Sequence, residues 1–148
     1  MQYFSKKKLN LPDGFFINST EIPPARLINN LLISAGSDFF SNEKLYQAIK
    51  TSNFFFAICS ESKRQVFGFV RVTSDKGLNA NLWNLCAQPG NNQKLFYSIL
   101  LGLTLEKINR EMPGCSISVQ APKSSFESLE EIGFVLDPNG IRVMGLRL

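Results

Sequence analysis

The chemistry open to this chain is limited first by a missing residue, because its 148 positions include no histidine. Ser-His-Asp and Cys-His nucleophilic sites and His-metal sites are therefore excluded. Carboxylates remain for general-base work, and the candidates are Asp38, Glu43 and Asp75. Each also has a structural interpretation, since Asp75 lies in a turn and Asp38 and Glu43 border a loop and a helix start.

The cysteines set a second limit. Cys59, Cys86 and Cys115 are far apart in the sequence and form no C-x-x-C pair. An odd number of separated cysteines argues against a disulfide framework or a zinc site, so we expect no bound metal and a reducing compartment. Cys86 lies in an apolar run, where a thiol is more often a small buried hydrophobe than a reactive group.

Apolar spacing predicts the elements that position these residues, in the order β-α-α-β-β-β-α-β-α-β-β. Continuous apolar runs predict strands at 15–17, 54–59, 66–72, 80–87, 117–121, 134–136 and 141–148. Helical spacing is found at 24–35, 42–49, 95–108 and 126–132. Ser41 is a suitable N-cap for the second of these helices.

The connections between the elements predict the fold class. Short turns join the strands between residues 54 and 87, which favours antiparallel hairpins, whereas the strand-helix-strand over 80–121 is long enough for a right-handed parallel crossover. We therefore expect one α/β domain over residues 14–148, with a mixed sheet and helices on both faces, after an N-terminal tail at 1–13.

Charge and hydropathy bear on partners and location. The net charge is +4, and the one basic run, Lys6-Lys7-Lys8, is near the chain start. Three adjacent lysines are more typical of a solvated tail than of a nucleic-acid site, so no nucleic-acid partner is expected. No apolar stretch reaches the roughly 18 residues of a membrane span, and no secretory signal pattern is present. We expect a soluble cytoplasmic protein without membrane contact.

Several segments together carry a family pattern. Residues 66–71 (VFGFVR) are similar to (I/L)-x-G-x-x-R, and residues 74–84 (SDKGLNANLWN) to SD-x-x-x-N-A-x-(I/L)-W-(D/N). Residues 132–134 (IGF) are similar to a helix-ending LGF, and residues 137–144 (DPNGIRVM) to DP-(E/N)-GI-(K/R)-x-M. On these residues the chain resembles the GNAT superfamily, the GCN5-related N-acetyltransferases, and within it the group encoded in plastid and cyanobacterial genomes.

The resemblance implies the GNAT fold and an acetyl-CoA site between the fourth strand and the third helix. In the superfamily this loop carries (Q/R)-x-x-G-x-(G/A), because the pyrophosphate approaches backbone N–H groups at a helix N-terminus and glycines keep Cβ atoms away. In the matching segment here, Asn92 stands at the Gln/Arg position, and Leu95 and Tyr97 stand at the glycine positions. The alternative interpretation is that Leu95 and Phe96 are ordinary helix residues facing the core.

Polar groups that suit phosphates remain in this loop. Asn91, Asn92 and Gln93 offer hydrogen-bond donors, and Lys94 offers a positive charge. These residues are the implied binding groups for the pyrophosphate of acetyl-CoA.

The fourth strand and fourth helix supply the rest of the implied site. In family members this strand separates from the next one to form a slot for the pantetheine arm. The matching residues are Asn84, Leu85, Cys86 and Ala87, whose backbone groups can pair with an amide-bearing ligand. Many GNAT enzymes also place a tyrosine in the fourth helix as general acid, and Leu129 stands at that position here.

Two functions follow from the resemblance. The first is an N-acetyltransferase that transfers acetyl from acetyl-CoA to an amine of a small molecule or a protein. The second is a catalytically inactive GNAT-fold module that binds a partner or ligand in an altered cofactor slot. GNAT domains often dimerise, so a homodimer is a further expectation by analogy.

Overall fold

The computed structural model describes residues 9–62 and 64–137 of the chain. Over these residues the sheet contains five strands in the spatial order of the sequence: β1 (Phe15–Asn18), β2 (Phe54–Ser60), β3 (Val66–Ser74), β4 (Asn79–Ala87) and β5 (Ser116–Val119). Strands β1 to β4 pair as antiparallel neighbours, and β5 pairs with β4 in parallel. The predicted mixed sheet is confirmed, since the long β4–β5 connection contains a helix and the short turns make hairpins.

Four helices and one short turn are the other elements of the described residues: α1 (Ala25–Ser34), α2 (Asn42–Lys50), α3 (Gln93–Glu111), the 3-10 turn η1 (Lys123–Ser125) and α4 (Phe126–Glu131). The predicted cap on α2 is confirmed, because the Lys44 N–H donates to Ser41 Oγ at 3.3 Å. Pro24 stands directly before α1, where a fixed φ and a missing N–H suit a helix start.

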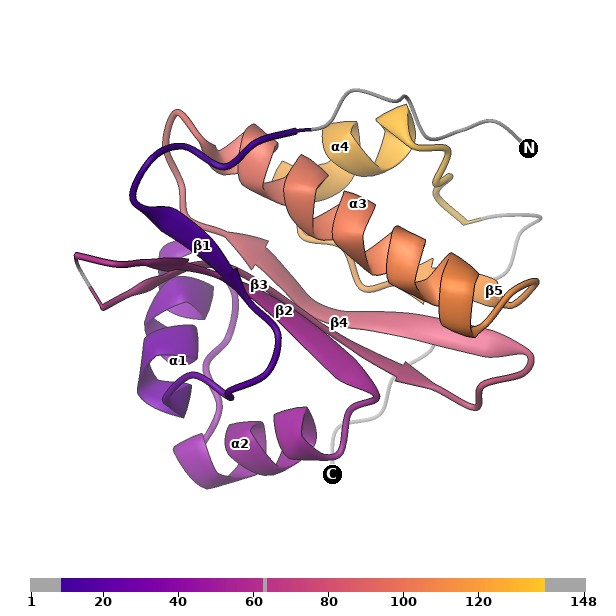
Figure 1. Ribbon diagram of the computed structural model, residues 1–148, viewed down its shortest axis with the longest axis horizontal. Coiled ribbons are helices and arrows are strands. Elements are labelled where there is room, and N and C mark those ends of the chain that lie inside the picture. The colour runs from indigo at the N-terminus through magenta and orange to yellow at the C-terminus, as the bar shows by residue number, and fades with distance from the viewer. Residues whose placement is uncertain (1–8, 63, 138–148) are drawn as a thin grey trace.

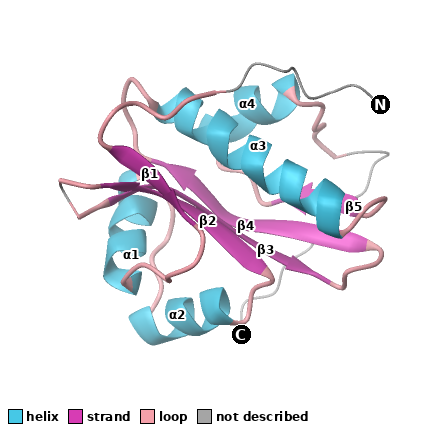
Figure 2. Ribbon diagram, viewed as in Figure 1, coloured by secondary structure: helices cyan, strands magenta, loops and turns pink. Residues whose placement is uncertain are grey.

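The sheet lies between two helical layers. Helices α3 and α4 cover one face, and α1 and α2 cover the other (Figures 1 and 2). Because side chains alternate along a strand, β3 sends Val70 and Val72 to the α3 face and Phe69 to the α1 face, and all three are fully buried. Burial on both faces is what near-continuous apolar strands predict. The predicted α/β class is confirmed.

The predicted strand over residues 134–136 is wrong. The chain there is irregular, and Val135 and Leu136 are 66% and 70% exposed. The reason is the end of α4, where Gly133 adopts a positive φ of 99° and the Phe134 N–H donates to the Leu129 carbonyl at 3.0 Å. This Schellman-type ending turns the chain back over α4, with Phe134 packed on the core, so these residues do not run along the sheet.

Some predicted features lie outside the described residues. They are the basic run at residues 6–8, the strand at 141–148 and most of the DPNGIRVM segment. Within the described part of the chain, none of the helices is long and apolar enough to cross a membrane.

Candidate functional site

The distinctive feature of β4 is a bulge close to the point where it leaves β5. Phe69 of β3 pairs with Cys86, but Arg71 pairs with Trp83, so β4 holds one residue more than β3 between these pairs. Asn84 adopts a positive φ of 53°, which Asn tolerates better than most residues.

The pairing between β4 and β5 ends early. Its last pair is Leu82 with Val119, and within the described chain residues 83–87 have no strand beside them on that edge. A strand end of this kind has backbone N–H and C=O groups that need other partners.

At the end of β4 these partners are side chains of α3. The Gln93 Nε2 group donates to the Ala87 carbonyl at 3.0 Å. The Ala87 N–H donates to the hydroxyl of Tyr97, and that hydroxyl also bonds Ser124 Oγ at 2.8 Å. Both backbone groups of Ala87 are therefore satisfied within the chain.

Tyr97 is the largest fully buried side chain of the described core. Burial raises the pKa of its phenol, while the hydrogen bonds with Ser124 and Ala87 oppose that rise. The phenol therefore remains protonated at neutral pH and can accept from Ala87 while donating to Ser124. The Tyr97 ring fills the space at the position where the family pattern has glycine or alanine.

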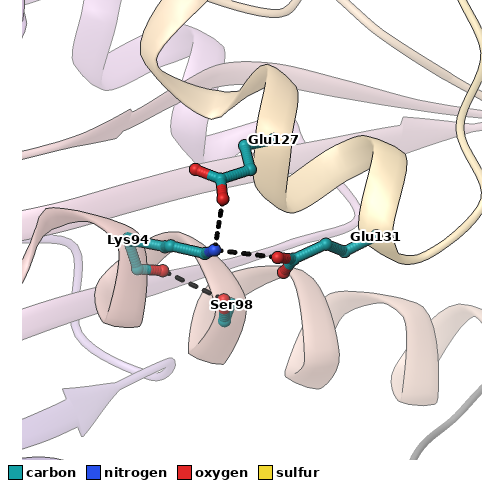
Figure 3. A network of polar contacts seen from close by, with 4 residues as sticks. All are labelled: Lys94, Ser98, Glu127 and Glu131. Carbon is teal, nitrogen blue, oxygen red and sulfur yellow. Dashed lines mark hydrogen bonds and ion pairs between the residues drawn. The ribbon is translucent and has the colours of Figure 1, made fainter.

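Lys94 does not point to an open phosphate site. Its Nζ lies 2.6 Å from Glu127 Oε1 and 2.8 Å from Glu131 Oε1, both on α4, and Ser98 Oγ donates to its carbonyl at 3.0 Å (Figure 3). The hydrogen bonds to Glu127 and Glu131 raise the pKa of the Lys94 ammonium. The pairs are exposed and contribute little to folding, but they neutralise the cation at the start of α3.

Backbone donors remain at this helix start. Asn92 is the N-cap and makes no side-chain capping bond, and Asn91 is exposed beside it. The N–H groups of Lys94 and Leu95 have no hydrogen-bond partner among residues 9–62 and 64–137. Leu95 is half-buried against the core, as its alternative interpretation predicted. The α3 N-terminus can thus still attract an anion through backbone groups.

The other residues of β4 and α4 are divided between the two faces of the sheet. Leu85, Ala87 and Leu129 pack in the core on the α3 side. Cys86 is fully buried on the α1 side, and burial raises the pKa of its thiol well above its ordinary value. Cys86 is therefore a neutral, buried hydrophobe, and Leu129 brings no proton donor to the strand end.

The three candidate carboxylates lie elsewhere. Asp75 is in the β3–β4 turn, where its Oδ1 accepts from the N–H groups of Gly77, Leu78 and Asn79 at 2.8–3.0 Å. From that turn to Ala87 the strand extends about 26 Å at 3.3 Å per residue. Asp38 lies in the α1–α2 loop and Glu43 in the first turn of α2, and both are exposed.

A cavity beside the bulge was not predicted from the sequence. It has a volume of about 210 Å³ and is lined by Phe40, Lys44, Leu45, Ala48, Arg71 and Asn84. Arg71 Nε donates to Asn84 Oδ1 at 2.7 Å, and its guanidinium lies 5.8 Å from the centre of the Trp83 ring. The sequence signal for this cavity is Arg71, a charged residue between two apolar strand residues, Val70 and Val72.

The comparisons with known proteins agree with this fold. No family model matches the chain. The chain is 27% identical over 139 residues to a protein named "Uncharacterized N-acetyltransferase ycf52" from Porphyra purpurea, with 93% of this chain and 79% of that one covered. A protein of the same name from Pyropia yezoensis is 23% identical over 104 residues, and the chain spans 59% of its length.

Solved structures show the same fold. The chain is similar to a protein of unknown function from Staphylococcus aureus, described as "Probable Acetyltransferase", with a TM-score of 0.77 at 16% identity over 90% of this chain and 100% of that one. It is also similar to a "predicted acetyltransferase with acetyl-CoA" from Clostridium acetobutylicum, with a TM-score of 0.60 at 13% identity over 88% and 96% of the two chains. The chain therefore has the fold of these acetyltransferases, and in sequence it is similar to proteins named N-acetyltransferase.

Proposed function

We propose that this chain is an N-acetyltransferase that transfers an acetyl group from acetyl-CoA to an amine. The observation that carries the proposal is the end of β4, which leaves β5 after Leu82 and presents the N–H and C=O of Ala87 at the parted edge. The relatives' printed activity supports the same reaction. In it, the amine nitrogen bonds to the acetyl carbon as the carbon–sulfur bond breaks, and the amine loses a proton while the sulfur gains one.

The slot at the end of β4 can accept acetyl-CoA only after two side chains move. Acetyl-CoA supplies an activated thioester on an amide-bearing arm, and the two groups of Ala87 that suit such amides are held by Gln93 and Tyr97. Gln93 is half-exposed and can turn outward at small cost, whereas Tyr97 must leave a fully buried position. Exposing a large apolar side chain costs about 1.5–3 kcal/mol, which weakens binding by about 10- to 150-fold.

The start of α3 supplies the anion-binding groups of the proposal. The free N–H groups of Lys94 and Leu95 suit a pyrophosphate, aided by the helix dipole. Lys94 adds its charge only when its ion pairs with Glu127 and Glu131 open. Both features predict that binding depends on a local rearrangement.

Turnover is expected to be slow. A positioned general acid contributes typically about 10²- to 10⁴-fold, and Leu129 cannot act as one. The exposed carboxylates Asp38 and Glu43, in the α1–α2 loop and the first turn of α2, are the proposed acceptors of the amine proton, through water. Rate enhancement then rests on holding the amine next to the thioester.

A second candidate function is a binding module without catalysis. The full burial of Tyr97 favours it, because this side chain occupies the slot and satisfies Ala87 without any ligand. Such a module would bind no acetyl-CoA and would act through another surface of the domain.

The test combines binding with turnover. Acetyl-CoA is titrated into the protein by calorimetry, and thiol release is then followed with a panel of small amines, with products identified by mass spectrometry. Reactions without protein and without amine correct for thioester hydrolysis. Weak binding and amine-dependent thiol release support the acetyltransferase. No binding at millimolar acetyl-CoA together with no thiol release would leave the binding module as the function.

A further inference from the structure

The cavity beside the β4 bulge carries two cationic side chains without an acidic partner. We propose that Arg71 and Lys44 hold the anionic group, a carboxylate or a phosphate, of a small acceptor amine. The inference rests on the proposed function and deepens it by naming the substrate class. Lys44, Leu45 and Ala48 of α2 and Arg71 and Asn84 of the sheet line the cavity together with Phe40. Helix α2 covers the face of the sheet opposite α3 (Figure 1).

The guanidinium of Arg71 has donors to spare. It carries five N–H groups. The Nε–H donates to Asn84 Oδ1 at 2.7 Å, and one N–H of Nη1 donates to Ser52 Oγ at 3.4 Å. Three of the five N–H groups form no hydrogen bond with the described residues. Both acceptors are neutral. A planar fork of free N–H groups matches two oxygens of a carboxylate or phosphate.

No acidic side chain neutralises this charge. Within the described chain, every ion pair of 4.0 Å or less involves Lys94, Lys107 or Arg110, not Arg71 or Lys44. The remaining residues, 1–8, 63 and 138–148, contain no Asp or Glu. Arg71 is half-buried, and burial lowers the pKa of its guanidinium. A bound anion would offset this desolvation directly.

Lys44 has no structural role that explains its position. It stands in the first turn of α2, where a positive charge opposes the helix dipole. Its backbone N–H serves the Ser41 cap, but its ammonium forms no hydrogen bond or ion pair with residues 9–62 or 64–137. A cation that is unfavourable for its helix and lines a cavity with Arg71 is consistent with an anion site.

The size and location of the cavity limit the ligand. A volume of about 210 Å³ is below the range of sites for drug-sized ligands, so the ligand is small. Phe40, Leu45 and Ala48 line it with apolar surface that suits a short carbon chain. Asn84 borders the cavity and is three residues from Ala87, about 10 Å along the strand. The cavity therefore borders the bulged segment of β4 that leads to its parted end.

The experiment measures binding without acetyl-CoA, so it does not depend on turnover. Three probes are titrated into the full chain at low salt: 4-aminobutyrate, O-phosphoethanolamine and, as the amine without an anion, butylamine. We expect at least one anionic probe to bind about tenfold or more tightly than butylamine, with the Arg71 Nε–H resonance shifting on binding. Binding of only the carboxylate or only the phosphate probe supports the site and identifies the anion. Equal binding of all three, or none by either anion, would overturn it.

Charge variants locate the site. Lys44→Gln should weaken anion binding about twofold to fivefold, because one exposed charge contributes up to about 1 kcal/mol. Lys50→Gln removes the same charge from the same helix. Because Lys50 lines a separate cavity, this variant should leave anion binding unchanged. An equal loss in both variants would mean general charge attraction and overturn the proposal. Anion binding without thiol release would support this anion site and contradict the acetyltransferase proposal. Thiol release at equal rates with anionic and neutral amines would support the acetyltransferase and contradict the anion site.

Discussion

The hydroxyl of Tyr97 accepts a hydrogen bond from the backbone N–H of Ala87, so a side chain from α3 occupies the donor at the end of β4. In a sheet this donor would pair with a neighbouring strand, and in the proposed reaction it would pair with an amide of the donor substrate. Tyr97, together with Gln93, therefore completes the hydrogen bonding of Ala87 at the end of the strand.

Gly68 in β3 is expected to be required for close packing against α3. A Cβ at this position would lie 3.0 Å from Leu100 Cδ1 and 3.1 Å from Ile58 Cδ1, and both side chains are fully buried. Gly68→Ala should lower the free energy of unfolding by about 1–3 kcal/mol through overpacking, measured by urea denaturation.

The matched control for that change is Gly102→Ala in the interior of α3, where a Cβ meets no atom within 4 Å. Alanine gains about 1 kcal/mol over glycine in a helix, so this variant should be more stable than the natural chain. Stabilisation by both changes, or destabilisation by both, would contradict the packing at Gly68.

The Asp75 turn should give the hairpin an acid-sensitive contribution. Hydrogen bonds from the backbone N–H groups of Asn79 and Gly77 lower the pKa of the Asp75 carboxyl below its ordinary value of about 3.9. Because the pKa of Asp75 is lower in the folded state than in the unfolded state, its carboxylate stabilises the fold at pH values above the unfolded-state pKa. This contribution is lost as the pH falls through the folded-state pKa. Thermal melts from about pH 6 to about pH 2 should therefore show a stability decline below about pH 4 that Asp75→Asn reduces.

The control for the turn is Asp38→Asn, which removes an exposed carboxylate from the α1–α2 loop that forms no hydrogen bond with the rest of the described chain. It should leave the acid decline as in the natural chain. If Asp75→Asn and Asp38→Asn behave alike, the turn hydrogen bonds of Asp75 do not contribute to stability.

Release of Lys94 should strengthen the binding of coenzyme A. The double change Glu127→Gln and Glu131→Gln removes both ion-pair partners and should tighten binding about threefold to tenfold, since exposed pairs are worth up to about 1 kcal/mol each. The gain should shrink as salt rises. A calorimetric titration with coenzyme A measures it directly.

A second double variant, Glu106→Gln with Glu130→Gln, removes the same charge from exposed positions on α3 and α4. Neither residue forms an ion pair with Lys94. An equal gain from this pair would show that net charge, not release of Lys94, controls binding.

Most of the fold followed from local patterns in the sequence. The apolar runs of β2 and β3, the Ser41 cap and the proline before α1 are signals that tertiary packing strengthens. The predicted strand at 134–136 is wrong because an apolar run does not reveal that Gly133 will turn the chain back at the end of α4. Element type depends there on a hydrogen bond between the Phe134 N–H and the Leu129 carbonyl.

The candidate site was less accessible to sequence reasoning. The sequence placed Tyr97 at a glycine position, but its bond to Ser124 depends on η1 lying beside α3, which no local pattern indicates. Arg71 and Lys44 are 27 residues apart by number, and only the packing of α2 on the sheet brings them to one cavity. The roles of Asn84, Gln93 and the candidate carboxylates remain predictions.

The measurement that tests the account most directly is a calorimetric titration of acetyl-CoA into the natural chain, Tyr97→Ala and Tyr97→Phe. Alanine is allowed at this position in the family pattern, and its small side chain opens the slot, although the cavity costs about 3–5 kcal/mol of stability. Circular dichroism confirms that each variant is folded, and Tyr97→Phe keeps the packing while removing the hydroxyl.

We predict that Tyr97→Ala binds acetyl-CoA about 10-fold or more tightly than the natural chain, because binding to this variant no longer has to expose a buried tyrosine side chain. Tyr97→Phe should bind as weakly as the natural chain, because its ring still fills the slot. Absence of binding by all three folded proteins, or equal affinity for all three, would contradict the claim that Tyr97 closes an acetyl-CoA slot at the end of β4.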